Sequence, residues 1–357
     1  MGGTTSRPAA TSPVLAPAVA PAPQPVTTAA AAATASRVTA TPYGSPPPPV
    51  LHLELTTAAP GQLRGGGRVV IVGDVHGCSD ELTALLAKLG FIAGLDNLLL
   101  VGDLVIRTAR ELGAWAARGN HDDAALAAHR EIAAGRDVPG KHKWAAGLSE
   151  DREALDYLTR LPFSISLPQL GLLVVHAGVI PGVNLASQDL AVLYKMRDLT
   201  RLANDASWEW LEKGVKGGGS AAWAKCWDGP QHVVFGHDAK RGLQRERAAT
   251  GLDTGCVYGN SLTACVLPPP DGLASSEALR AKLSARRPPR LQDLGAELVS
   301  VPAARVYAKK DDDGSGGKAS KEGGKEKGKE GKDDKEGKHR KEGEAGKGKG
   351  KQKGKSK

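Results

Sequence analysis

The chain of 357 residues carries a formal charge of +9, but this charge is confined to its two ends. Residues 309–357 hold 18 basic and 11 acidic side chains, which gives +7, and residues 1–67 hold three basic and one acidic, which gives +2. The part between them, residues 68–308, is therefore neutral. A strongly basic globular face is excluded, and this part is long enough for one large α/β domain.

The four cysteines form no CxxC pair and lie far apart along the chain. They indicate neither a disulfide framework nor a zinc knuckle, and they suit a reducing compartment. No apolar run approaches the roughly 18–20 residues that a membrane-spanning helix needs. We therefore expect a cytoplasmic protein without a transmembrane segment. The sequence leaves the oligomeric state open.

The two ends of the chain have compositions that predict disorder. Residues 1–67 start with an Ala-, Pro-, Thr- and Ser-rich stretch that has no acidic residue before Glu54, and such a stretch buries too little apolar surface to offset the entropy of ordering. Two targeting interpretations stay open there, because residues 1–6 fit the N-myristoylation pattern and the acid-poor composition resembles an organelle transit peptide. Residues 309–357 are rich in Lys, Gly and Glu, so we expect a solvated tail that either contacts nucleic acid or only adds solubility.

Residues 68–308 are expected to form one domain that starts with a buried strand. Residues 69–72 are four consecutive β-branched apolar residues, which is typical of a strand buried on both faces. In chain order, the apolar patterns predict strands over residues 69–72, 97–101 and 115–122, helices over residues 80–89 and 108–113, and mainly helical structure over residues 123–160.

The second half of this domain is expected to consist mainly of strands. Two further apolar runs end in a histidine, at His176 and at His237. Residues 251–267 favour a hairpin that turns at Gly259-Asn260, since Gly-Asn is a turn signal between two apolar runs. Residues 298–301 and 304–307 predict closing strands.

Five of the predicted strands end in Asp, His or Asn side chains. Ligands of α/β sheets gather at the carboxyl ends of the strands, so we expect these side chains to converge. Six oxygen and nitrogen ligands suit two divalent cations that share one carboxylate, and a mixed set of this kind favours manganese, iron or zinc over calcium. Two such cations clamp a phosphate and lower the pKa of a bridging water. The predicted ligands are Asp74, His76, Asp103, Asn120, His176 and His237, with Asp103 as the shared carboxylate.

The motifs that carry these residues resemble a known family. Gly-Asp-Val-His-Gly, Gly-Asp-Leu-Val, Gly-Asn-His-Asp, His176-Ala-Gly and Gly-His237-Asp are similar to motifs of the calcineurin-like metallophosphoesterases of the phosphoprotein-phosphatase superfamily. Two longer stretches, which begin at Val234 and Gly251, resemble the ApaH-like phosphatases, relatives of the bacterial symmetrical diadenosine tetraphosphatase. The resemblance covers residues 68–308 and implies an α/β (α+β) fold, a β-sandwich with helices outside both sheets.

The resemblance also implies roles for single residues. His121 would be the general acid, as its position beside the ligand Asn120 also suggests. Arg197 would clamp the phosphate with its forked guanidinium, and a surface ion pair between Arg197 and Asp198 is the alternative. The first metal ion would take Asp74, His76 and Asp103, and the second would take Asp103, Asn120, His176 and His237.

One stretch departs from the family pattern. After Gly-Asp-Leu-Val the family continues with a polar residue, a basic residue, Gly and Pro, whereas this chain continues directly with Ile-Arg-Thr-Ala-Arg. The missing loop would present a phosphate-binding side chain, for which Arg107 or Arg110 could substitute. Ile106 stands where family members often place a carboxylate that orients the acid histidine, so we hypothesise that Asp122 takes over that role.

The sequence therefore predicts a two-metal phosphoesterase that hydrolyses a phosphate ester or a pyrophosphate bond. The substrates that fit this interpretation are a phosphorylated small molecule such as a dinucleoside polyphosphate, a capped RNA, or a phosphoprotein, in which case the chain would be a protein Ser/Thr phosphatase. The alternative from another class is a catalytically impaired variant that acts as an interaction protein and binds RNA through its lysine-rich tail.

Overall fold

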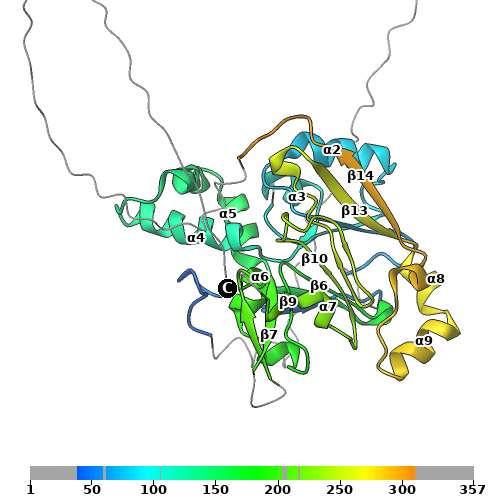
Figure 1. Ribbon diagram of the computed structural model, residues 1–357. Helices are drawn as coiled ribbons and strands as arrows, with labels where there is room; N and C mark the ends of the chain where they lie inside the picture. The colour runs from blue at the N-terminus through cyan, green and yellow to red at the C-terminus, as the bar shows by residue number, and fades with distance from the viewer. Residues whose placement is uncertain (1–37, 59–61, 105, 203–206, 216–217, 310–357) are drawn as a thin grey trace, which may run out of the picture. The chain divides into compact units, whose positions relative to one another are not determined.

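The computed structural model describes residues 38–58, 62–104, 106–202, 207–215 and 218–309. Two β-sheets face each other, helices cover their outer sides, and a third, small sheet stands beside them (Figure 1). This is the sandwich that the sequence predicts. Of the segments predicted to be disordered, 1–67 and 309–357, residues 1–37 and 310–357 lie outside the described part.

The first sheet has six strands in the order β1-β5-β6-β10-β12-β11. β6, β10 and β12 run parallel to one another, while β5 pairs antiparallel with β6 and parallel with β1. The strands are β1 (His52–Glu54), β5 (Ser164–Leu167), β6 (Leu172–Val175), β10 (His232–Phe235), β11 (Gln244–Arg245) and β12 (Ala249–Gly251).

The second sheet has five strands in the order β14-β13-β2-β3-β4. β2, β3 and β4 are parallel, and β13 pairs antiparallel with both β2 and β14. The strands are β2 (Val69–Val72), β3 (Asn97–Leu100), β4 (Trp115–Ala116), β13 (Ser261–Leu267) and β14 (Glu297–Pro302).

The remaining elements are short helices and the third sheet, whose order is β8-β7-β9. Its strands are β7 (Asp198–Arg201), β8 (Trp208–Leu211) and β9 (Ser220–Ala222). The α-helices are α2 (Ser79–Lys88), α3 (Ile106–Glu111), α4 (Asn120–Ala133), α5 (Arg152–Arg160), α6 (Leu190–Lys195), α7 (Trp223–Cys226), α8 (Pro270–Ala274) and α9 (Glu277–Ser284). The 3-10 turns are η1 (Gly140–Ser149), η2 (Pro168–Leu170), η3 (Leu185–Ser187), η4 (Cys256–Tyr258) and η5 (Leu291–Leu294).

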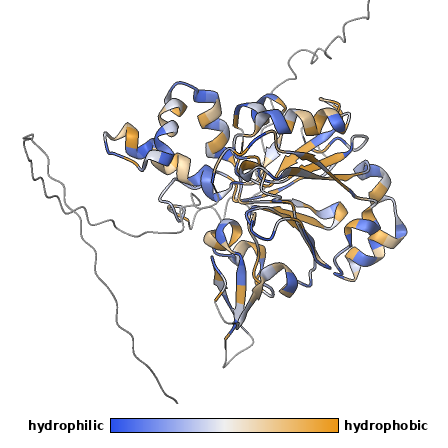
Figure 2. Cartoon of the chain, turned by 45° about the horizontal axis from the view of Figure 1, so that its top comes forward, coloured by the Kyte–Doolittle hydropathy of each residue, from blue (hydrophilic) through white to orange (hydrophobic). Residues whose placement is uncertain are grey.

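The core explains why the central strands read as continuous apolar runs. Successive side chains of a strand point to opposite faces, and in β2 both faces are covered. Val69 and Ile71 point into the space between the two sheets, whereas Val70 and Val72 pack under the helices α2 to α5. Figure 2 shows these strands as hydrophobic, while the outer faces of the helices are hydrophilic. Within the described residues, no helix combines the length and the apolar character that a membrane span requires.

The start of the ordered fold differs from the prediction. Residues 1–67 were expected to be disordered, but β1 pairs with β5 in the first sheet. Leu51, Leu53 and Leu55 are buried, with exposed fractions of 2%, 7% and 2%. β1 has only three residues, a leucine between two polar residues. This pattern is too short to indicate a strand within a Pro- and Thr-rich stretch.

Three of the predicted elements are wrong. The strand expected over residues 115–122 spans only Trp115–Ala116, because α4 begins at Asn120. The hairpin over residues 251–267 does not form, since β12 belongs to the first sheet and β13 to the second, with η4 between them. Residues 304–307 form no strand; this segment is held by Glu81, which accepts hydrogen bonds from the Ala304 N–H and the Tyr307 hydroxyl.

Two of the four cysteines lie close together in the fold. Cys78 and Cys256 are far apart along the chain, yet their sulfurs and a Glu81 carboxylate oxygen lie within 4.8 Å of one another in the buried core. Both cysteines are free thiols. This group joins the start of α2 to η4.

Candidate functional site

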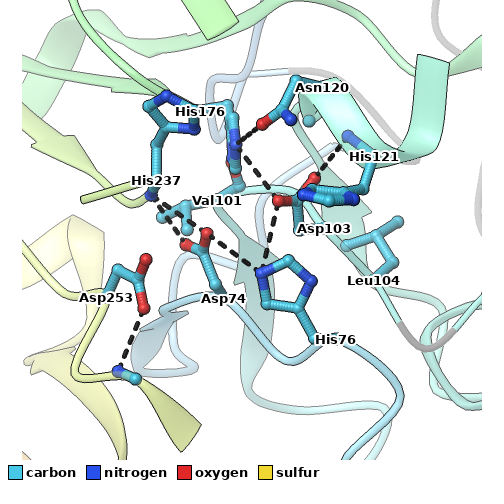
Figure 3. A network of polar contacts seen from close by, with 12 residues as sticks. Asp74, His76, Val101, Asp103, Leu104, Asn120, His121, His176, His237 and Asp253 are labelled. Atoms are coloured by element: carbon cyan, nitrogen blue, oxygen red, sulfur yellow. Dashed lines mark hydrogen bonds and ion pairs between the residues drawn. The ribbon is translucent and has the colours of Figure 1, made fainter. Parts of the chain in front are cut away.

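The loops that follow β2, β3, β6 and β10 meet at one place, although they come from two sheets (Figure 3). β2 and β3 are parallel neighbours in the second sheet, and β6 and β10 are parallel neighbours in the first. Because parallel strands end at the same edge, each pair brings its loops together. The sandwich places the two edges side by side and so gathers Asp74, His76, Asp103, His176 and His237.

Asp103 lies at the centre of this group. Its Oδ2 is 3.4 Å from Nε2 of His76 and 3.4 Å from Nε2 of His176. Nε2 of His176 is also 2.9 Å from Oδ1 of Asn120, which comes from the first turn of α4. Nε2 of His76 is 3.9 Å from Oδ2 of Asp74. The predicted residues thus surround the carboxylate that the sequence analysis singled out as shared.

Two overlapping groups of ligand atoms in the described structure could hold cations. One consists of His76, Asp103 and His121, and the other of Asp74, Asp103 and His176; within each group the ligand atoms lie within 4.8 Å of one another. Asp103 belongs to both groups. Two cations that share a carboxylate need such an overlap, so the donor set fits a dinuclear centre.

Three residues of the site have a backbone in the left-handed region. The φ angles are 46° at His76, 51° at Asp103 and 68° at His237. A non-glycine residue in this region is uncommon and costs on the order of 1–3 kcal/mol, so it persists only where the surroundings fix it. Such strain clusters at ligand-binding sites, which supports a functional role for these loops.

Bare glycine backbone makes room for two of the carboxylates. A Cβ atom on Gly236 would lie 1.8 Å from Oδ1 of Asp74, and a Cβ on Gly119 would lie 2.1 Å from Oδ1 of Asp103. Any side chain at either position would displace the carboxylate. The lack of space for a side chain therefore explains why glycine precedes both His237 and Asn120.

Backbone groups orient the histidine rings. Nδ1 of His176 is 3.1 Å from the Val101 carbonyl, and Nε2 of His237 is 3.1 Å from the Lys195 carbonyl. A ring nitrogen that donates to a carbonyl leaves the other nitrogen as a lone-pair donor for a cation. In His176 that other nitrogen is Nε2, which faces Asp103.

The electrostatics of the site also fit a cation. Burial lowers the pKa of His76 to about 4 and holds the pKa of His237 well below its usual range, so both imidazoles are in the neutral form that binds metals. Burial raises the pKa of Asp74, and the neighbouring charges of Asp253 and Asp103 raise it further. A cation among these crowded carboxylates would relieve their repulsion.

His121 and Asp122, the predicted catalytic pair, lie in the first turn of α4 and line the same cavity, described below, but they have different partners. The His121 ring packs edge-on against the His76 ring, with centroids 5.0 Å apart. The Asp122 carboxylate accepts hydrogen bonds from the N–H groups of Asp103 (2.9 Å), Leu104 (3.1 Å) and Gly119 (2.8 Å). Asp122 thus holds the backbone around Asp103, and burial raises its pKa to about 7.

Arg197 does not pair with Asp198. Asp198 accepts from Nη2 of Arg241 at 2.7 Å, whereas Nη2 of Arg197 donates to the His237 carbonyl at 3.1 Å and its Nη1 donates to the Glu212 carbonyl at 3.3 Å. The ion-pair alternative is therefore wrong. Arg197 instead holds the loop that carries His237.

Of the two arginines on α3, Arg107 faces the site. It lines a cavity of about 560 Å³ that opens beside the ligand groups. Its side chain is 71% exposed, and Nη2 donates to Asp151 at 3.3 Å. Arg110 forms an ion pair with Glu153 and is not among the residues that line this cavity. Of the two arginines that could substitute for the missing phosphate-binding side chain, Arg107 is thus the one beside the ligand groups.

Asp253 is a site residue that the sequence analysis did not single out. It follows β12, is 4% exposed, and accepts a hydrogen bond from the Gly255 N–H at 3.0 Å (Figure 3). Burial raises its pKa to about 7. The signal was present in the sequence, because Asp253 ends a strand as Asp103 does, but β12 is short and its pattern merges with the following apolar run.

An aspartate shared by two ligand groups, at the facing strand ends of a β-sandwich, defines a centre of the dinuclear metallohydrolase type. The sequence profile of the calcineurin-like phosphoesterases matches residues 67–253, more than half of the chain. The chain belongs to this family, which confirms the resemblance seen in the motifs. Calcineurin-like phosphoesterases use a dinuclear metal centre, and the clusters found here are candidates to hold it.

Several relatives are named bis(5'-nucleosyl)-tetraphosphatases. The symmetrical enzyme of Photobacterium profundum is 28% identical over 258 residues, which cover 54% of this chain and 92% of the relative. That of Actinobacillus pleuropneumoniae is 30% identical over 253 residues, 54% of this chain and 93% of the relative. An asymmetrical enzyme of Halalkalibacterium halodurans is 27% identical over 231 residues, 56% of this chain and 89% of the relative.

A solved structure has the same fold. It is the crystal structure of a protein provisionally assigned as a diadenosine tetraphosphatase, with 32% identity and a TM-score of 0.53. The match covers 70% of this chain and 97% of that one.

Proposed function

We propose that the chain is a metal-dependent phosphohydrolase that cleaves a pyrophosphate bond in nucleoside polyphosphates. The observation that carries the proposal is the position of Asp103 in both candidate ligand groups. The similarity to relatives named as tetraphosphatases supports the substrate class.

The ligand assignment is the one that the family resemblance implies, and the contacts among these side chains support it. Asp74, His76 and Asp103 would hold the first ion, and Asp103, Asn120, His176 and His237 would hold the second. When bound, the two cations would supply Lewis-acid polarisation of the phosphate and a water acidic enough to attack it.

The remaining residues position the substrate and its protons. His121 lines the cavity, where its imidazole can protonate the departing oxygen. Arg107 lines the same cavity and binds the phosphates. Asp122 positions the loop of Asp103 through three backbone hydrogen bonds. Arg197 positions His237 and can direct its remaining N–H groups to a phosphate oxygen.

The test is turnover of defined substrates by the purified full chain loaded with manganese, iron or zinc. Diadenosine tetraphosphate is expected to be hydrolysed faster than capped RNA, a phosphopeptide or p-nitrophenyl phosphate. Asp103→Asn should lower kcat by about 100-fold or more, because the loss of one preorganised electrostatic contact usually has an effect of this size. Asp80→Asn, an exposed carboxylate on α2, is the matched control and should keep full activity. Undiminished turnover in Asp103→Asn, or in a chelator, would contradict the proposal.

Other parts of the prediction stay proposals. Phosphoprotein and capped RNA are the alternative substrates, and the experiment above includes both. We retain residues 68–308 as the proposed catalytic domain between the segments 1–67 and 309–357. β1 is the exception, because it precedes residue 68 and belongs to the central fold. Contact of the lysine-rich tail with nucleic acid concerns residues outside the described part.

A further inference from the structure

The cavity beside the candidate metal centre is lined by two chemically different sets of side chains. One set is His76, Asp103 and His121, the residues proposed to act on the phosphate. The other set is Ile106, Trp144 and Leu148, which are apolar. With a volume of about 560 Å³ the cavity lies within the range of small-molecule sites and exceeds what a phosphate group needs.

Trp144 is held in place but leaves its indole open to the cavity. It is 55% exposed, one of the most exposed large apolar side chains among the described residues. Its neighbours on η1, Ala145 and Leu148, are 0% and 5% exposed and belong to the core under α4. The carbonyl of Ala145 is 3.3 Å from Nδ1 of His129 on α4. The backbone that carries Trp144 is therefore anchored, while the ring has an uncovered face.

A fixed indole with an uncovered face suits a flat aromatic ligand. Every nucleobase has a π-face, and base stacking on an aromatic side chain needs no specific hydrogen bonds. A phosphopeptide would instead need backbone partners along an extended groove. A base is thus the part of a phosphorylated substrate that the apolar side chains of the lining accommodate best.

A positive charge in the same lining fits the linking phosphates. Arg107 lines the cavity with a side chain that is 71% exposed. Its partner Asp151 is 25% exposed at 3.3 Å, and a pair as exposed as this holds a guanidinium only weakly. Arg107 can therefore exchange Asp151 for a phosphate oxygen at small cost.

We propose that Trp144 stacks on the base of a nucleoside polyphosphate whose phosphates pass Arg107 and reach the metal centre. This inference rests on the proposed function and adds the residue that selects nucleotides over other phosphate esters. Trp144 contacts only the base, so it contributes to substrate selection and takes no part in bond cleavage.

The test compares two ligands with a non-hydrolysable P–CH2–P group that differ only by the nucleoside. Binding of α,β-methylene ADP and of methylenediphosphonate to the manganese-loaded full chain is measured by calorimetry. Trp144→Ala is expected to weaken the nucleotide about 10-fold or more and to leave methylenediphosphonate within about 2-fold. Trp144→Phe should keep most of the nucleotide affinity. Trp208→Ala removes an indole on β8, which does not line this cavity, and is the matched control.

The outcomes are separable. Equal effects of Trp144→Ala on both ligands, no effect on either, or a loss confined to methylenediphosphonate would each overturn the inference. Trp144→Leu keeps the apolar volume without an aromatic face, and it replaces Trp144→Ala with the same expectation if that variant does not fold. These binding measurements need no turnover. A nucleotide-selective effect without any hydrolysis by the wild-type chain would therefore refute the proposed activity and leave the stacking intact.

Discussion

Neighbouring residues of the first turn of α4 have separate duties. Both His121 and Asp122 line the cavity, but the Asp122 carboxylate also satisfies three N–H groups around Asp103. The sequence analysis paired them, with Asp122 orienting the histidine. The contacts favour a different reason for Asp122, namely that a tight loop at the end of β3 leaves N–H groups with no strand partner.

Asp122→Ala is expected to destabilise the fold and the metal centre together. Three buried N–H groups lose their acceptor, and each costs about 1–3 kcal/mol, so the free energy of unfolding should fall by about 3 kcal/mol or more. Urea denaturation measures this change, and metal content should fall in parallel because Asp103 is no longer held. Asp156→Ala, an exposed aspartate on α5, should change stability by less than about 0.5 kcal/mol. A stable, metal-loaded Asp122→Ala protein would argue against this role.

His232 gives the fold a dependence on pH that is remote from the metal site. It is 1% exposed, its Nε2 is 2.9 Å from Thr250 Oγ1 and its Nδ1 is 3.0 Å from the Pro289 carbonyl. Burial lowers its pKa to about 4, against about 6.5 in the unfolded chain. Between these two values the unfolded state binds a proton that the folded state does not, so stability is complete above pH 6.5 and falls as the pH drops towards 4.

The expected loss from His232 is about 2 kcal/mol between pH 7 and pH 5, with about 3 kcal/mol in all by pH 4. Urea unfolding of the wild type and of His232→Gln at both pH values measures it, and the variant should lose less stability on acidification by about that amount. An identical pH dependence in the two proteins would show that the histidine already titrates normally in the fold.

At the scale of the elements, the strands that are buried on both faces were the elements predicted best from the sequence. The other elements were predicted less well. β2, β3, β6 and β10 read as unbroken apolar runs, and the rule that ligands gather at strand ends then located the residues of the site. The rest depends on which sheet a strand joins. β12 and β13 look like one hairpin because a turn signal separates them, but the choice of partner strands is made by the tertiary fold.

Helix and strand were confused where the local pattern is ambiguous. Residues 115–122 start with apolar side chains that fit a strand, yet Gly119 and Asp122 form the start of α4 because the Asp122 carboxylate accepts the Gly119 N–H at 2.8 Å. Asp253 was missed for the same kind of reason, as β12 has only three residues. Short strands carry too few positions for a period to show.

The loop after β10 supports a prediction about the centre. A Cβ on Gly236 would lie 1.8 Å from Oδ1 of Asp74 and 2.6 Å from Cγ2 of Val101, both in the buried interior. Gly236→Ala must therefore move the Asp74 carboxylate. We expect metal affinity and turnover to fall about 10-fold or more, the usual scale when a group that orients a ligand is lost. Metal content by atomic spectroscopy and kcat/KM measure the two effects.

Gly272→Ala is the matched control for this change. A Cβ there has no atom within 4 Å, and Gly272 lies inside α8, far along the chain from the predicted ligands. Alanine in a helix is favoured over glycine, so this variant should be neutral or slightly more stable. Gly236→Ala with normal metal content would mean that the strand ends have more freedom than the packing indicates.

At the scale of the whole molecule, the site depends on how the two sheets are packed against each other. Asp74 and Asp103 belong to the second sheet, and His176 and His237 to the first. The two sheets are joined by an apolar core that includes side chains from β1 and its surroundings. The fold that holds the metal centre therefore extends N-terminal to residue 68, the limit that composition suggested.

This dependence can be tested by two truncations of the full chain. Removal of residues 1–37 leaves every described residue in place and should change neither melting temperature nor turnover. Removal of residues 1–67 takes away β1, which pairs with β5, itself the antiparallel neighbour of β6. It also removes the buried side chains Val50, Leu51, Leu53, Leu55 and Leu63.

Burial of an aliphatic side chain is worth about 1.5–3 kcal/mol, so the loss of five exceeds the whole stability of many domains. The longer truncation should therefore be insoluble or unfolded. Leu53→Asp in the full chain changes a single side chain and should lower the melting temperature by several degrees. Turnover should also be lost, because β1 supports β5, β5 pairs with β6, and His176 follows β6. If the chain without residues 1–67 melted at the same temperature as the chain without residues 1–37, β1 would have no part in holding the two sheets, and the limit at Arg68 would stand as the sequence predicted it.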